Sequence, residues 1–235
     1  MEFGLTDPLV VTYALIVVRL STALVVMPMC GATGVPPHTK IGLALFMGLV
    51  LVPLQEPIDL PPGMGPIIAV AIREGLIGFA MGFAVTLVFQ SMEVAGSFVG
   101  VQMGLGLGQV FDPMTGAGSN ELRRFYQVLA TLIFFLVNAH HQVIAGLFGT
   151  FDILPLNTFS GDELNITAMI QISAQMFISA VQIALPIVAA LFMTDVALAV
   201  IARTMPQLNV LIVGMPVKIA VGLLMLMTAL PATTR

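Results

Sequence analysis

Charged residues inside apolar segments are the first feature of this sequence that could do chemistry. Seven lie in or beside long apolar runs: Arg19, Arg73, Glu74, Glu93, Asp195, Arg203 and Lys218. Ionisable groups at membrane depth are rare, and they mark either ion and proton pathways or charge pairs. Because these seven do not share one face of one helix, we favour pairing between helices or subunits. A proton or ion path stays open as the alternative.

Three other patterns could carry chemistry, and none is well supported. His140 and His141 are neighbours, so on a helix they face different ways, and no Cys or acid lies nearby at ligand spacing. We therefore expect an interfacial pair and no metal site. Gly104, Gly106 and Gly108 resemble part of a dinucleotide fingerprint, but no strand precedes them. No Ser, His and Asp set has the motif context of a nucleophilic enzyme, so we expect neither catalysis nor a cofactor.

The middle of the chain holds a stretch rich in Gly and Met. Gly96, Gly100, Gly104 and Gly108 recur at every fourth residue. On a helix this spacing places them on one face, where two backbones can approach closely. Gly106 lies off that face and weakens the helix around it. We expect a helix that packs closely through its glycines and is loosened toward its end.

The same stretch then becomes irregular. Asp112-Pro113 favours a turn, Gly116 and Gly118 break regular structure, and no charge other than Asp112 lies in residues 105–120. An irregular segment at membrane depth is tolerated only where protein buries it or where it lines a water-filled space. This central loop is therefore the first candidate for a functional segment.

Composition indicates that the whole chain is an integral membrane protein. Of its 235 residues, 58% are hydrophobic and 9% are charged. Soluble domains carry about 25% charged residues, so this apolar surface cannot be hidden in one water-exposed fold. The net charge of −4 offers no basic patch for nucleic acid, and the single cysteine, Cys30, excludes an internal disulfide. No Lys or Arg precedes Arg19, so we expect no cleaved signal peptide.

Apolar runs define the elements that must position these residues. We expect about six membrane helices with an outward-facing N-terminus, at residues 9–29, 41–54, 67–90, 125–151, 166–200 and 210–230. The second run is short for a bilayer. Pro186 lies inside the fifth run, where it is expected to kink the helix.

Small residues line the third of these runs. Gly75, Gly78 and Gly82 form a face suited to helix–helix packing. Together with Gly96 and Gly100, they are the glycines that we expect to contact other helices closely.

Several short motifs occur in a fixed order along nearly the whole chain. They are Arg19 followed by Pro28, Val35-Pro36 with Lys40-Ile41-Gly42, Arg73-Glu74-Gly75, Gly78-Phe79, Gly100-Val101-Gln102-Met103-Gly104, Phe111-Asp112-Pro113, Asn138 with His140, and Ala202-Arg203-Thr204-Met205-Pro206. In order and spacing, this set resembles the FliR/SctT family of membrane subunits of type III export gates. The motifs around the central loop are the most specific part of the resemblance.

The resemblance implies a fold and a set of partners. It implies an all-α, multi-helix integral membrane protein with kinked helical hairpins, assembled with FliP-like and FliQ-like subunits in a helical hetero-oligomer. Residues 1–165 would be the FliP-like part and residues 166–235 a FliQ-like helical hairpin. The implied location is the bacterial inner membrane at the flagellar basal body. There the assembly, in contact with membrane lipid and other export components, would pass unfolded flagellar proteins through a channel.

The resemblance also implies that the central loop plugs the closed pore. The residues expected to form this plug or gate are Met103, Gly104, Gly106, Gly108, Phe111, Asp112, Pro113, Met114, Gly116 and Gly118. A passive connector between the two halves of the chain is the alternative for the loop. For the whole protein, the alternatives are the injectisome counterpart of the same gate and a small-molecule or ion transporter.

Overall fold

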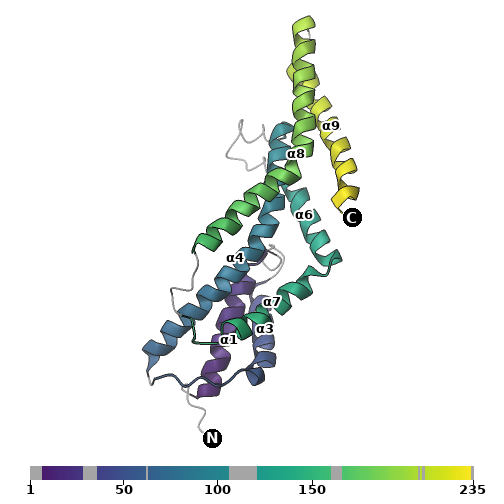
Figure 1. Cartoon of the computed structure of the whole chain (residues 1–235). Helices are drawn as coiled ribbons and strands as arrows, with labels where there is room; N and C mark the ends of the chain where they lie inside the picture. The colour runs from purple at the N-terminus through teal and green to yellow at the C-terminus, as the bar shows by residue number, and fades with distance from the viewer. Residues whose placement is uncertain are drawn as a thin grey trace. The chain divides into compact units, whose positions relative to one another are not determined.

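The computed structural model describes residues 7–28, 36–61, 63–105, 121–159, 166–205, 207 and 210–233, and all regular structure among them is helical (Figure 1). Its elements are α1 (Pro8–Val26), α3 (Pro37–Leu51), the short 3₁₀ helix η1 (Val52–Leu54), α4 (Met64–Gln102), α6 (Glu121–Leu136), α7 (Ala139–Ile153), α8 (Ile166–Thr204) and α9 (Val210–Thr233). The predicted all-α class is confirmed.

The chain forms two compact units. Unit 1 comprises Met1–Val88 and Ile133–Ile172, and unit 2 comprises Phe89–Leu132 and Ser173–Arg235. Each of the long helices α4 and α8 therefore contributes to both units. The expected FliP-like and FliQ-like parts, divided at residue 165, concern likeness to partner folds and stay a prediction.

Local sequence signals set the ends of α1. The Asp7 carboxylate accepts the N–H of Leu9 at 3.1 Å, and Pro8 begins the helix where its missing N–H has no cost. At the other end, Met27 is extended with ψ 129°, because the following Pro28 disfavours helical backbone in the residue before it. The helix is thus 19 residues long, close to what a bilayer crossing needs.

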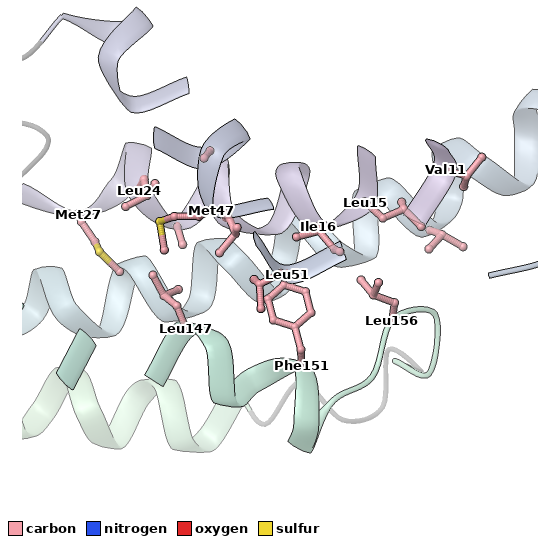
Figure 2. Packing of buried hydrophobic residues seen from close by; sticks show 14 residues of the cluster. Val11, Leu15, Ile16, Leu24, Met27, Met47, Leu51, Leu147, Phe151 and Leu156 are labelled. Carbon is pink, nitrogen blue, oxygen red and sulfur yellow. The ribbon is translucent and has the colours of Figure 1, made fainter. Parts of the chain in front are cut away.

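The core of unit 1 is a contact between helices distant in sequence. Figure 2 shows Phe151 and Leu147 projecting from α7 toward Leu51 and Met47 of α3, with Ile16 of α1 beside them. These five side chains are buried. Apolar burial of this kind contributes about 25 cal/mol per Å² of surface removed from water, and it fixes the neighbours of Arg19 on α1.

The core of unit 2 is separate. It joins the end of α4 to α6, α8 and α9 through Ala95, Val99, Met103, Leu122, Tyr126, Ala180, Ala184, Ile187, Leu191 and Leu226. Small alanines on α4 and α8 let these helices lie close, and the larger side chains fill the space beside them.

The prediction of one continuous helix from residue 125 to residue 151 is wrong. The structure divides it into α6 and α7 at Asn138, whose φ of 55° is left-handed. The N–H of Val137 bonds to Ile133 O at 2.9 Å and that of Asn138 to Phe135 O at 3.1 Å, which closes the end of α6. Asn is one of the few residues that adopts left-handed backbone at low cost, so no Gly or Pro was needed for the break.

The number of helices long enough to cross a membrane is smaller than the expected six. Among the described residues, three qualify by length and composition: α1, α4 and α8. The bent pair of α6 and α7 gives a fourth if it counts as one span. Hydropathy counts apolar runs and does not register the break at Asn138, and the second run forms a helix, α3, of only 15 residues. α8 continues as one helix through Pro186.

Candidate functional site

A fully buried ion pair joins α1 to α4 in unit 1. Arg19 and Glu74 are both 0% exposed. The Nε of Arg19 donates to Oε2 of Glu74 at 2.6 Å, and the Nη2 of Arg19 lies against the same oxygen. Two charges taken this far from water are tolerated only when they are paired and hydrogen-bonded.

Arg19 also holds the end of α7. Its Nη1 donates to the carbonyl of Leu154 at 3.0 Å and to that of Thr150 at 3.3 Å. The guanidinium lies over the Phe151 ring, 4.3 Å from the ring centre, in a cation–π contact. Carbonyls in the last turn of a helix lack helical partners and carry partial negative charge, so a buried arginine stabilises them. One side chain therefore connects three helices.

The segment that follows α7 is held by the same network. Oε1 of Glu74 accepts the N–H of Asn157 at 3.1 Å, and Asn157 has a left-handed φ of 64°. Arg73, which is exposed, reaches the carbonyl of Phe159 from its Nη1 at 3.5 Å. Both oxygens of Glu74 are thus occupied by donors within the chain. This geometry favours a structural joint over a proton relay, which needs a free oxygen to receive the proton.

Two glycines bring α4 against α1 beside this pair. A Cβ added at Gly78 would overlap the carbonyl of Arg19 and the hydroxyl of Thr22. One added at Gly82 would meet the carbonyl of Ala23 at 2.5 Å. These contacts are with backbone, which cannot move aside cheaply. The close approach therefore requires glycine at both positions.

Gly75 does not share this requirement. A Cβ there would lie 3.7 Å from the methyl groups of Thr22 and Val18, which is ordinary contact. Gly75, Gly78 and Gly82 were expected to act alike on one face. The structure separates them, because residues 78 and 82 face the α1 backbone and residue 75 faces its side chains.

Gly96 makes the corresponding close contact in unit 2. A Cβ on it would lie 2.9 Å from the carbonyl of Leu122 and from Tyr126 Cβ, so α6 crosses α4 here with no room for a side chain. Gly100 is also buried. The expected continuation of this face to Gly104 and Gly108 is wrong at Gly104, which has left the helix.

The end of α4 is a Schellman motif. Gly104 has a left-handed φ of 83°. The N–H of Leu105 bonds to the Gly100 carbonyl and that of Gly104 to the Val101 carbonyl, both at 3.0 Å. The spacing of four residues between these glycines predicted one continuous glycine face on a helix. Left-handed backbone at Gly104 instead turns the chain out of the helix, which glycine permits without the strain that a Cβ would add.

Charge pairs in unit 2 are more exposed than the pair in unit 1. Lys218 of α9 pairs with Oδ1 of Asp195 in α8, with the side chains 23% and 34% exposed. Arg123 of α6 lies 3.1 Å from Oε2 of Glu93, with side chains 61% and 16% exposed. Arg203 is exposed and has no charge partner among the described residues. Of the seven charges singled out in the sequence, only Arg19 and Glu74 are fully buried in this chain.

The predicted plug residues fall into two groups. Met103 is 1% exposed and belongs to the core of unit 2, and Gly104 ends α4. These two form the base of the loop. The other eight, Gly106, Gly108, Phe111, Asp112, Pro113, Met114, Gly116 and Gly118, lie outside the described residues.

The histidine pair lies at the start of α7. The rings of His140 and His141 are 4.1 Å apart between centres, and Phe135 lies 5.3 Å from His140. Within the part of the chain that the structure describes, no three His, Cys, Asp or Glu side chains gather closely enough to hold a metal.

Sequence reasoning did not identify which of the charged residues are buried. Glu74, Gly78 and Gly82 are spaced four apart, so they share one helix face, whereas Arg73 points elsewhere. That spacing identifies Glu74 as the buried member of the Arg73-Glu74 pair. Sequence reasoning also missed Gln102, whose Nε2 donates to Oδ2 of Asp195 at 3.1 Å, and Gly222, which lies against Met103. Neither carries a local signal that separates it from ordinary helix residues.

These features define a class of protein: the described part of the chain is all-helical in its regular structure and has three or four apolar helices long enough to cross a bilayer. The profile of the bacterial export proteins, family 1, matches residues 10–235, nearly the whole chain. The chain therefore belongs to this family.

Three similar proteins support this assignment. The flagellar biosynthetic protein FliR of Bacillus subtilis is 35% identical over 224 residues, covering 93% of this chain and 85% of the relative. FliR of Escherichia coli is 30% identical over 207 residues, covering 87% and 78%. FliR of Aquifex aeolicus is 27% identical over 241 residues, covering 100% and 91%. The resemblance to the FliR family drawn from the sequence motifs is confirmed.

Proposed function

We propose that this chain is a subunit of the flagellar type III protein export gate in the bacterial inner membrane. With FliP-like and FliQ-like subunits it forms the channel that passes unfolded flagellar proteins, and its central loop plugs the closed channel. The observation that carries the proposal is the family match over residues 10–235, together with relatives named for flagellar biosynthesis.

The surface of the chain supports assembly with other subunits. Large apolar side chains are exposed along every long helix, for example Phe46, Ile72, Val128 and Phe192. Lipid can cover part of such a surface. Partner helices are the proposed cover for the rest, because α3, with 15 residues, is too short to cross the bilayer as a simple span.

The composition of the central loop supports the plug. Residues 106–120 include five glycines or prolines and one charge, Asp112. Such a segment changes conformation at low cost and presents little charge to an entering polypeptide. Both ends of the loop are attached to a packed core, at Met103 and at Leu122.

Copurification tests the assembly. The tagged chain, expressed with its neighbouring FliP-like and FliQ-like gene products and extracted in detergent, is expected to elute as one complex of defined mass. Recovery of the chain as a stable single subunit that transports a small solute in vesicles would contradict the proposal.

Deletion tests the plug. Removing residues 111–118 is expected to leave the complex intact and to make the membrane conductive to small ions, measured in planar bilayers or as ion entry into cells. An assembled deletion variant whose membrane shows no added ion conductance would contradict the plug function.

A further inference from the structure

The helix α8 is the membrane-length helix that its own chain covers least. Of the three described helices long enough to cross a bilayer, α8 has 17% of its most apolar stretch buried, against 44% for α1 and 28% for α4. One face of α8 is buried in the core of unit 2, through Ala180, Ala184, Ile187 and Leu191. Most of the remaining surface of α8 therefore needs cover from outside the chain.

Residues on the opposite side of α8 are spaced by alternating steps of three and four. All are exposed, and together they form what we call the outer face of α8: Gln175, Ile178, Gln182, Leu185, Ala189 and Phe192. Alternation of three and four is the spacing by which one helix packs along another in a left-handed pair. The outer face thus has the geometry of an unoccupied helix–helix contact.

Two amides lie seven residues apart on the outer face. Gln175 and Gln182 are exposed, and neither makes a hydrogen bond to the described part of the chain. An amide that faces hydrocarbon leaves its donors and its acceptor without partners, which costs free energy. Lipid alone is therefore a poor cover for this face.

Water is a poor cover for the other residues of the same face. A water-filled space would satisfy the amides but would wet Ile178, Leu185 and Phe192, and a row of large apolar side chains is normally covered by protein. A helix with hydrogen-bonding side chains covers both kinds of residue. Small residues such as Ala189 let such a helix approach closely, and polar side chains hold it in place.

Arg203 adds a charge beyond the end of the outer face. It lies fourteen residues, or two repeats of seven, after Ala189, in the last turn of α8. It is exposed and has no charge partner among the described residues. A carboxylate on the covering helix complements this charge and favours one orientation of that helix.

We propose that the outer face of α8 binds a helix of a neighbouring export-gate subunit along its length. That helix presents hydrogen-bonding side chains seven residues apart, opposite Gln175 and Gln182, and a carboxylate near Arg203. The inference rests on the proposed function, since it needs the FliP-like or FliQ-like subunits, and it adds the surface and the chemistry of the contact. Polar residues in an otherwise apolar contact fix the register of the two helices.

Photo-crosslinking tests where the partner lies. The photoreactive residue p-benzoylphenylalanine replaces Ile178, Leu185 or Phe192, one at a time, in the full chain coexpressed with its FliP-like and FliQ-like subunits. Phe177 and Ile201 are the matched positions, because they are exposed on the same helix but lie outside the outer face. Adducts with a partner subunit, identified by mass, are expected to be several-fold more abundant at the three outer-face positions. Equal adducts at all five positions, or adducts with lipid alone, would overturn the inference.

Substitution of one amide tests the chemistry of the contact. Gln182→Leu removes the hydrogen-bonding group and is expected to weaken assembly about 3–10-fold, the range that such bonds between membrane helices contribute. The measurement is the concentration of partner subunits at which half of the chain is in complex in detergent. Gln182→Asn keeps an amide and is expected to lose less. Gln142→Leu removes an exposed amide from α7 and is the matched control, expected to assemble like the wild type.

The outcomes distinguish this inference from the proposed function. If the chain copurifies with the gate subunits while Gln182→Leu assembles like the wild type, the proposed function stands and the inference is overturned. If the wild-type chain does not assemble with those subunits, both fail. Labelling of Gln182→Cys by a water-soluble maleimide in the assembled complex, in a Cys30→Ser background, would assign the outer face to a water-filled space and overturn the inference.

Discussion

The two compact units handle charge in opposite ways. In unit 1, Arg19 and Glu74 are 0% exposed and hold three helices together. In unit 2, the pairs Asp195–Lys218 and Glu93–Arg123 keep part of their side chains open to the surroundings. Both kinds of pair join two different helices, so the difference between the units lies in burial.

Burial decides what each pair contributes. Removing one member of a buried pair leaves an unpaired charge away from water, which costs about 3–5 kcal/mol. An exposed pair is screened, and its loss costs about 0–1 kcal/mol. Unit 1 is therefore built around a joint that must stay closed. In unit 2 the Glu93–Arg123 pair, whose arginine side chain is 61% exposed, contributes least, and the Asp195–Lys218 pair, with side chains 34% and 23% exposed, lies between the two cases.

The largest effect is expected from breaking the buried pair. Arg19→Met should destabilise the complex by about 3–5 kcal/mol, because Glu74 is left charged and buried. The measurement is the yield and thermal midpoint of the complex in detergent. Arg73→Gln is the control, since Arg73 is exposed and makes one contact at 3.5 Å. Equal losses from the two variants would show that burial of the arginine does not determine the cost of removing it.

A somewhat smaller effect is expected from crowding the contact of α4 with α1. Gly78→Ala should cost roughly 1–3 kcal/mol, because its Cβ would meet the backbone of α1, whereas Gly75→Ala has room and should be close to neutral. The matched pair adds one methyl group in either case, and thermal unfolding of the complex compares them. Similar midpoints for the two variants would contradict the close approach at Gly78.

The third prediction concerns Gly104, at the end of α4 in unit 2. Gly104→Ala should cost about 1–2 kcal/mol, because an L-residue with a Cβ is strained at a φ of 83°. Gly104→Asn, which tolerates left-handed backbone better, should lose less. The order of the two thermal midpoints is the measurement. An alanine variant as stable as the wild type would show that the Schellman end is not maintained in the assembly.

The smallest effect is expected at the exposed pair. Arg123→Gln should change the stability of the complex by about 0–1 kcal/mol, and raising the salt concentration should shrink even that difference. Thermal midpoints at low and high salt measure it. A loss as large as that of Arg19→Met would mean that partner subunits bury Arg123, and the contrast between the units would hold only for the single chain.

Much of the helical architecture was predictable from apolar length alone. The start of α1, within one residue, and the long α8 follow from local signals and hydropathy, whereas the third run was expected to end at residue 90 and α4 continues as one helix to Gln102. The break at Asn138 was not predictable in this way. Its cause is one left-handed backbone angle at Asn138, and sequence pattern reports such angles reliably only when Gly or Pro marks them.

The charged residues show the same limit. Arg19 and Glu74 stand out in the sequence because charge in an apolar run is costly, but the pairing joins residues 55 positions apart. No periodicity connects α1 to α4 over that distance. The helix face shared by Glu74, Gly78 and Gly82 identifies Glu74 as the buried acid. Its partner, Arg19, is identified only by the packing of α1 against α4. Eight of the ten predicted plug residues lie outside the described part, so their role stays a prediction.

The Arg19 network also fixes an order of events during synthesis. Arg19 is made 55 residues before Glu74, and Leu154 follows Glu74 by a further 80 residues, the difference between positions 154 and 74. At roughly 5–20 residues per second, the arginine waits about 3–11 s for its carboxylate and a further 4–16 s for the end of α7. An arginine facing lipid is unfavourable throughout that time. Until the ribosome has made Glu74, α1 therefore needs water or another protein beside Arg19 as it enters the bilayer.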